Sequence, residues 1–141
     1  MSKSYKWYKI ADSLKELDFS KDGLCTVEVE SKKICISLFK EQIFATTAKC
    51  PHAGGNLSHG YVDAVGNIVC PIHRYKFSLE TGRNVTNEGY YLKTYPTEVR
   101  ENGVFVGIEE SGLFNWLKLL QLYFFLKQKS LFLHPAAKIT W

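Results

Sequence analysis

Apolar residues in the first 110 positions follow the pattern of short β-strands connected by turns. The runs are rich in β-branched and aromatic residues and are bounded by glycine, asparagine or charged pairs. The expected strands cover 7–10, 24–30, 33–39, 42–48, 61–64, 67–70, 75–79, 91–99 and 103–108. A helical turn is expected at 12–17, capped by Asp12. Strands at this spacing predict an all-β fold, an antiparallel sandwich or barrel.

The turn of the first long hairpin decides where two of the four cysteines lie. A turn at 31–32 would place Cys25 opposite Leu38. It would also place Cys35 opposite Glu28, on the other face of the hairpin. A disulfide between these two thiols is therefore not expected. We interpret Cys25 as a core residue and Cys35 as a free, more exposed thiol.

The pattern changes after Glu110. Residues 113–126 are almost wholly apolar, and their polar members, Asn115, Lys118 and Gln121, recur every three positions. That spacing predicts an amphipathic helix with a narrow polar stripe. The stretch is too short to span a bilayer. Three alternatives are open: contact with a membrane surface, packing on the body or on a partner subunit, and a poorly ordered tail. We favour a membrane or partner contact.

The chain is therefore expected to form one domain over 1–110, with a loop-rich region at about 45–84, followed by an apolar and basic tail at 111–141. The net charge is +4, but residues 1–110 hold 14 basic and 14 acidic side chains, so the excess belongs to the tail. We therefore expect no nucleic-acid partner. The polar start of the chain and its free thiols favour the cytoplasm.

Two short motifs carry the candidate chemistry. Cys50-Pro51-His52 and Cys70-Pro71-Ile72-His73 each combine one cysteine with one histidine, and 17 residues separate them. Zinc fingers usually group cysteines with cysteines and histidines with histidines. One cysteine and one histidine per loop suit two metal atoms of different character, one bound by sulfur and one by nitrogen.

These motifs lie within C-P-H-A-G-G-N-L-S-H-G and C-P-I-H-R-Y-K-F-S-L-E-T-G, which resemble the Rieske [2Fe–2S] motif, most closely that of soluble Rieske ferredoxins. The resemblance covers residues 5–109. It implies the Rieske fold, with 45–84 as the cluster-binding subdomain. It also implies that Cys50 and Cys70 hold the inner iron, and that His52 and His73 hold the outer iron. His59 is expected to be either a polar loop residue or a group that contacts the ligands.

The resemblance also predicts a low reduction potential. Respiratory Rieske proteins have hydroxyl donors where this chain has Tyr75 and Phe77, and disulfide cysteines where it has Gly55 and Ile72. Fewer donors to the cluster sulfurs favour the lower end of the range of roughly −150 to +300 mV. The covering loop, 84–91, lacks the proline often found in the family, so we expect Gly89, Tyr90 and Tyr91 to cover the cluster. Arg74, Lys76 and Arg83 would form a basic rim, which either is an ordinary solvated surface or steers a redox partner.

The predicted function is that of a one-electron carrier. The protein would pass electrons from a reductase to an oxygenase or a similar redox enzyme, and would not itself be an enzyme. A small Rieske-like subunit of a nitrite-reductase-type complex is the first alternative. A structural zinc-binding interaction domain that uses the same four residues is the second.

Overall fold

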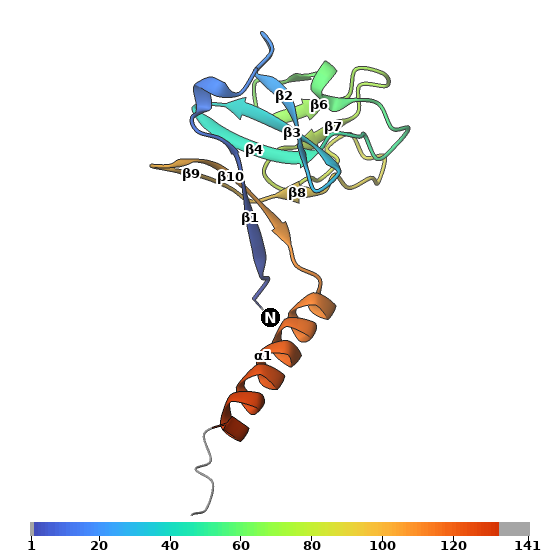
Figure 1. Cartoon of the computed structure of the whole chain (residues 1–141). Helices are drawn as coiled ribbons and strands as arrows, with labels where there is room; N and C mark the ends of the chain where they lie inside the picture. Colours follow the sequence, from blue (N-terminus) through green and yellow to red (C-terminus); the bar gives the residue numbers. More distant parts are fainter. Residues whose placement is uncertain (1, 133–141) are drawn as a thin grey trace, which may run out of the picture. The chain divides into compact units, whose positions relative to one another are not determined.

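The computed structural model describes residues 2–132 (Figure 1), which excludes the end of the predicted tail, including His134. The chain divides into two compact units, of which one is Tyr5–Ile108 and the other comprises the chain outside that range. The first unit contains both short 3-10 turns and all the strands, except for the last residue of the final strand. The second unit contains the described α-helix.

The fold is mostly β, as the sequence predicts. The strands are β1 Tyr5–Ala11, β2 Leu24–Val29, β3 Lys32–Phe39, β4 Gln42–Thr47, β5 Tyr61–Val62, β6 Asn67–Val69, β7 Lys76–Ser78, β8 Thr94–Tyr95, β9 Thr97–Arg100 and β10 Gly103–Glu109. The described residues also form two 3-10 turns, η1 Leu14–Glu16 and η2 Leu57–His59, and the helix α1 Gly112–Phe132. The predicted helical turn near position 14 is thus a single 3-10 turn.

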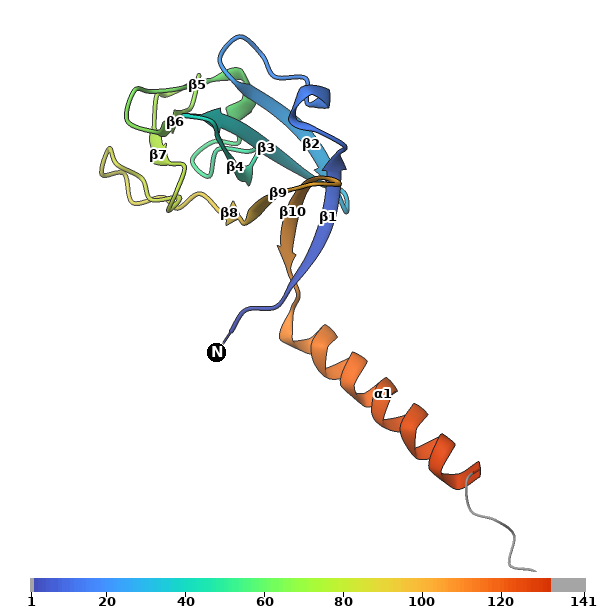
Figure 2. The same ribbon diagram turned by 90° about the vertical axis from the view of Figure 1, so that its left-hand side faces the viewer.

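Three small sheets make up the β structure. Their strand orders are β1-β10-β9, β2-β3-β4-β8 and β5-β6-β7. The sheet that contains β3 lies between the other two in both ribbon views (Figures 1 and 2). Every strand pair with a determined register is antiparallel.

Alternating residues of β3 divide the interior into two hydrophobic clusters. Ile34 and Ile36 belong to the first cluster, together with Val104 and Val106 of β10. Cys35 points the other way and belongs to the second cluster, which contains Cys50, Leu57, Cys70 and Phe77 among others. Because side chains alternate along a strand, β3 separates the first core from the second, which contains both motif cysteines.

The predicted register of the first hairpin is wrong by two residues. Glu30 and Ser31 form the turn with φ of 49° and 62°, so Val29 pairs with Lys32. Cys25 consequently lies opposite Ile36. Cys35 is fully buried rather than exposed, because the second cluster covers its face of β3. The two thiols do lie on opposite faces, as expected, and both are free. Burial raises the pKa of Cys25 to about 11 and that of Cys35 to about 12.

The predicted strand 91–99 is interrupted. Pro96 separates β8, which pairs with β4, from β9, which pairs with β10. The chain thus leaves one sheet and enters another at the proline, which cannot donate a hydrogen bond to a ladder. The Thr97 hydroxyl donates a hydrogen bond of 3.0 Å to the Ile43 carbonyl and so connects β9 to β4.

The helix predicted after Glu110 is present as α1, and it extends past 113–126 at both ends. Over the part of the chain that the structure describes, no helix combines the length and the apolar character needed to cross a membrane.

Candidate metal centre

The two cysteine–histidine motifs form loops with the same backbone hydrogen bonds. In the first loop the Cys50 N–H donates to the Gly55 carbonyl at 2.8 Å, and the Gly54 N–H donates to the Cys50 carbonyl at 2.9 Å. In the second loop the Cys70 N–H donates to the Tyr75 carbonyl at 2.9 Å, and the Arg74 N–H donates to the Cys70 carbonyl at 3.0 Å. The two loops therefore close in the same way, although they share little sequence beyond Cys-Pro.

Both loops need a left-handed residue four positions after the cysteine. Gly54 has φ of 73° and Arg74 has φ of 59°. Glycine adopts this conformation without a steric penalty, whereas arginine does not. Gly54 could be predicted to form a turn because of its residue type. Nothing in the sequence indicates that Arg74 takes the same left-handed conformation in the second loop.

The loop closures bring the two cysteines together in the interior. Cys50 is 3% exposed and Cys70 is 2% exposed. Burial raises the pKa of the Cys50 thiol, and the adjacent Cys70 thiol raises it further. A hydrogen bond from the His52 backbone N–H has the opposite, smaller effect. The two sulfur atoms are thus neighbours in a site from which water is excluded.

The two histidines meet outside the cysteines. The His52 and His73 rings lie 4.6 Å apart between centroids, edge to face. His73 is exposed, whereas His52 is half-buried. His52 Nδ1 is a buried nitrogen with no hydrogen-bond partner.

Two tyrosines enclose His52. The Tyr75 ring lies 4.4 Å and the Tyr90 ring 5.3 Å from the His52 ring, between centroids. The two tyrosines stack on each other at 5.9 Å. Tyr90 therefore covers the site as expected from loop 84–91, but Tyr91 does not, because it is 65% exposed and its hydroxyl accepts a hydrogen bond from Arg83. The sequence also gave no indication that Tyr75 packs on the histidines.

Glycine allows one loop to approach the other. A Cβ on Gly55 would lie 2.7 Å from Ile72 Cδ1 and 3.1 Å from Cys70 Sγ. A Cβ on Gly54 would meet nothing within 4 Å. Close approach therefore explains Gly55, while the left-handed turn explains Gly54.

The other polar residues near the loops have separate roles. His59 is exposed at the end of η2 and is not brought to the histidine pair. Within the predicted basic rim, Lys76 pairs with Asp63 at 3.5 Å and Arg83 bonds Tyr91, while Arg74 is exposed. Two of the three rim cations are thus engaged within the domain.

The residues present fit a [2Fe–2S] cluster. The site offers two adjacent buried thiols, two adjacent imidazoles, an orphaned ring nitrogen and a glycine that leaves room beside a sulfur. In residues 2–132 no three His, Cys, Asp or Glu side chains converge as ligands of a single ion. A tetrahedral zinc ion requires such convergence, whereas each iron of a Rieske cluster takes two protein ligands.

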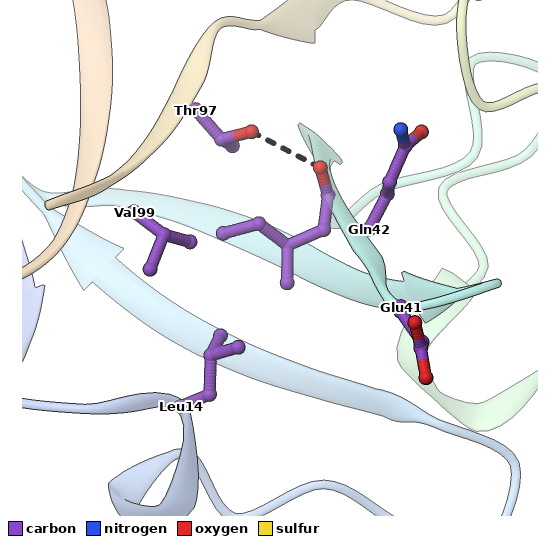
Figure 3. A pocket seen from close by; sticks show the side chains of 6 residues that line it. Leu14, Glu41, Gln42, Thr97 and Val99 are labelled. Carbon is purple, nitrogen blue, oxygen red and sulfur yellow. Dashed lines mark hydrogen bonds between the residues drawn. The ribbon is translucent and has the colours of Figure 1, made fainter.

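One surface pocket lies away from this site. It has a volume of about 290 Å³ and is lined by residues of η1, β4 and β9 and by the turn before β4 (Figure 3): Leu14, Glu41, Gln42, Ile43, Thr97 and Val99. None of the four predicted ligands lines it, so it has no part in the candidate centre.

Fold and site together define a small β domain built to hold a metal cluster on two loops. Residues 6–96 match the Rieske [2Fe-2S] domain family. This match covers more than half of the chain, and the chain belongs to that family. The [2Fe–2S] cluster is the cofactor that this family of domains binds.

Curated and solved relatives are similar over the same region. The chain is 28% identical over 78 residues to the ferredoxin subunit of 3-phenylpropionate/cinnamic acid dioxygenase from Photorhabdus laumondii, covering 55% of this chain and 74% of the relative. The carbazole 1,9a-dioxygenase ferredoxin of Nocardioides aromaticivorans has the same fold, with a TM-score of 0.63, 20% identity and coverage of 72% and 96%. So does a protein described as the small subunit of an NADH-dependent nitrite reductase from Mycobacterium tuberculosis, with a TM-score of 0.67, 17% identity and coverage of 77% and 99%.

Proposed function

We propose that this protein is a one-electron carrier that receives electrons from a reductase and delivers them to an oxygenase. Cys50 and Cys70 would hold the inner iron of a [2Fe–2S] cluster, and His52 and His73 would hold the outer iron. The bound cluster supplies reversible uptake of a single electron. The protein itself would act as a carrier and not as a catalyst.

The observation that carries this proposal is the separation of the donor set into a buried thiol pair and an outer imidazole pair. Burial of the sulfurs keeps water from the inner half of the site. The exposed edge of His73 gives a partner protein a short path to the outer half. The ferredoxin subunits among the relatives support the oxygenase as the acceptor.

The test is the metal content and spectrum of the full chain purified without oxygen. We expect two irons and two acid-labile sulfides per chain, roughly, and a paramagnetic signal after dithionite reduction. His52→Ala and His73→Ala should each abolish the signal. His59→Ala is the matched control because this histidine is exposed on a neighbouring turn, and it should leave the signal intact. A colourless protein with stoichiometric zinc and no sulfide would refute the proposal.

A second candidate is the small subunit of a nitrite-reductase-type complex. The fold likeness to the mycobacterial protein favours it, with coverage of 99% of that chain. The cluster chemistry would be unchanged, and only the partner would differ. Purification of the tagged chain from its own cells would separate the two candidates, because a stable large subunit should accompany the second but not the first.

We also propose that the carrier works in the cytoplasm, attached peripherally to a membrane through 113–126. Cys25 and Cys35, which are not among the proposed ligands, are both free thiols, and this fits a reducing compartment. The apolar surface of α1 supports the attachment.

A further inference from the structure

The loop between Asn84 and Tyr90 is not fixed by packing of its own side chains. Residues 85–89 are all exposed. The loop ends at Tyr90, which is half-buried and packs against the second hydrophobic cluster. A segment without buried side chains needs hydrogen bonds to keep a single path. The position of the Tyr90 ring therefore depends on the polar contacts of the loop.

The Asn84 side chain provides three of these contacts. Its Nδ2 group donates to the Lys76 carbonyl and to the Thr86 hydroxyl, both at 3.2 Å, and its Oδ1 atom accepts from the Glu88 N–H at 2.7 Å. The donor group and the acceptor of the carboxamide are thus both used, and only asparagine and glutamine carry such a group. Asn84 is half-buried, so water competes less for these atoms than it does on the open surface.

Two further features give the loop a defined path. The Thr86 hydroxyl in turn donates to the Glu88 carboxylate. Asn87 and Gly89 have φ of 67° and 80°, so the backbone bends between Thr86 and Tyr90. Asparagine and glycine are the residue types that adopt this left-handed conformation most readily.

The network joins the two rings that enclose His52. Lys76, which receives a hydrogen bond from Asn84, begins β7 and directly follows Tyr75. The loop ends at Tyr90, and the Tyr75 and Tyr90 rings stack with their planes 28° apart. Asn84 therefore connects the two backbone segments that carry these rings.

The tyrosine pair makes the outer part of the site asymmetric. It packs on His52, which is half-buried, and it leaves His73 exposed. Water stabilises an added charge, so a centre from which water is kept away is harder to reduce. The pair thus favours a low reduction potential, and a residue that fixes the pair affects the same quantity.

We propose that Asn84 is a positioning residue for electron transfer, which holds Tyr90 against Tyr75 and His52 and so keeps the reduction potential low. This inference rests on the electron-carrier function proposed above and adds to it a residue outside the two motifs. The effect of Asn84 on the site is transmitted by Tyr90.

The experiment compares the full holoprotein with Asn84→Ala, Tyr90→Ala and the double variant. A potentiometric titration gives the reduction potential, and amide hydrogen exchange of a peptide that covers 84–91 reports the order of the loop. Asn84→Ala should raise the potential as much as Tyr90→Ala does. The double variant should shift it no further, because both substitutions remove the same cover. Loop exchange in Asn84→Ala should accelerate by about fivefold, as expected for the loss of a hydrogen bond.

Two variants serve as controls. The Thr81 hydroxyl accepts a hydrogen bond of 3.2 Å from the Arg83 N–H in the turn just before the loop, so Thr81→Ala removes a similar bond and should change neither measurement. The Glu88 carboxylate interacts electrostatically with His52, and loss of the network also releases this charge. The potential shift caused by Asn84→Ala should therefore persist in the Glu88→Gln background.

Thr86→Val is a milder variant for the case in which Asn84→Ala does not hold iron. It keeps the Asn84 bonds to Lys76 and Glu88, so it should raise the potential less than Asn84→Ala. This smaller shift should vanish when Tyr90→Ala is also present.

Four outcomes would overturn the inference: unchanged loop exchange, an unchanged potential, a shift that adds in full to that of Tyr90→Ala, or a shift that disappears with Glu88→Gln. An unaltered chain without iron refutes the electron carrier and this inference with it. A reducible chain whose potential does not depend on Asn84 refutes this inference alone.

Discussion

At the scale of single residues, Gly55 controls the gap between the two loops. Gly55→Ala should prevent normal cluster assembly, because the new methyl group would press on Cys70 Sγ and the Ile72 side chain. Gly54→Ala is the control. It places a residue with a Cβ at φ of 73° but meets no atom, so it should cost only about 1 kcal/mol of stability. Iron and sulfide per chain measure the difference, and equal loss in both variants would contradict the role assigned to Gly55.

Tyr90 excludes solvent from one of the two histidines. Tyr90→Ala should expose His52 and raise the reduction potential by tens of millivolts, because water stabilises the added negative charge. Tyr91→Ala should leave the potential unchanged, since Tyr91 contacts Arg83 and points to solvent. A potentiometric titration followed by the paramagnetic signal compares them. An unchanged potential in Tyr90→Ala would show that Tyr90 does not shield the site.

At the scale of elements, one carboxylate organises the turn between β5 and β6. Asp63 accepts hydrogen bonds from the backbone N–H groups of Val65 and Asn67, at 3.1 and 2.9 Å, and pairs with Lys76. Burial favours its protonated form, but the hydrogen bonds outweigh that effect and hold the pKa of Asp63 below its usual value. The turn supports β6, which leads directly into Cys70.

Asp63→Asn should therefore destabilise the domain by about 1 kcal/mol near neutral pH. Because the folded-state pKa is the lower one, the stabilisation is present above the unfolded pKa of about 4 and disappears as pH falls through the folded pKa. The gap between variant and unaltered chain should thus close below about pH 4. Urea unfolding at several pH values measures this gap. If the difference in unfolding free energy stays constant with pH, the substitution destabilises the domain through packing and not through the carboxylate's charge.

The elements also show what a sequence can and cannot predict. The alternation of β-formers predicted most strands, and Gly66 marked its turn correctly, with φ of 89°. The turn of the first hairpin was placed at 31–32 rather than at Glu30 and Ser31, because neither residue type signals a left-handed backbone. Cys35 was expected to be exposed, but its face of β3 is covered by the second hydrophobic cluster. Strand propensity likewise predicted one continuous strand over 91–99. The strand is interrupted at Pro96 because its two halves pair with different strands, β4 and β10, which propensity does not show.

The candidate site also has a part that the sequence predicts and a part that it does not. The spacing of Cys50, His52, Cys70 and His73 predicts a shared centre. The fold places the two cysteines next to each other and the two histidine rings 4.6 Å apart. Their surroundings were less predictable. Nothing in the sequence indicated that Tyr75 packs on His52, because its position depends on closure of the second loop around a left-handed Arg74. The motif residues can be predicted from the local sequence, whereas the positions of the side chains around them depend on tertiary contacts.

At the scale of the whole molecule, the two hydrophobic clusters should depend differently on the cofactor. Cys50 and Cys70 are members of the second cluster, while the first contains none of the predicted ligands. A bound metal group stabilises the parts of a protein that supply its ligands. Chelation of the iron under mild acid should therefore loosen the second cluster and leave the first largely folded.

Amide hydrogen exchange of the full chain, before and after iron removal, tests this prediction by region. Exchange should accelerate by more than about tenfold in β6 and β7, whose Ile68 and Phe77 are fully buried in the second cluster. It should change little in β10, where Val104 and Val106 pack against Ile34 and Ile36 in the first. Equal acceleration in both regions would mean that β3 couples the clusters into one cooperative unit. That result would make cluster loss an unfolding event for the entire β domain, since the strand that separates the two cores would then also transmit instability between them.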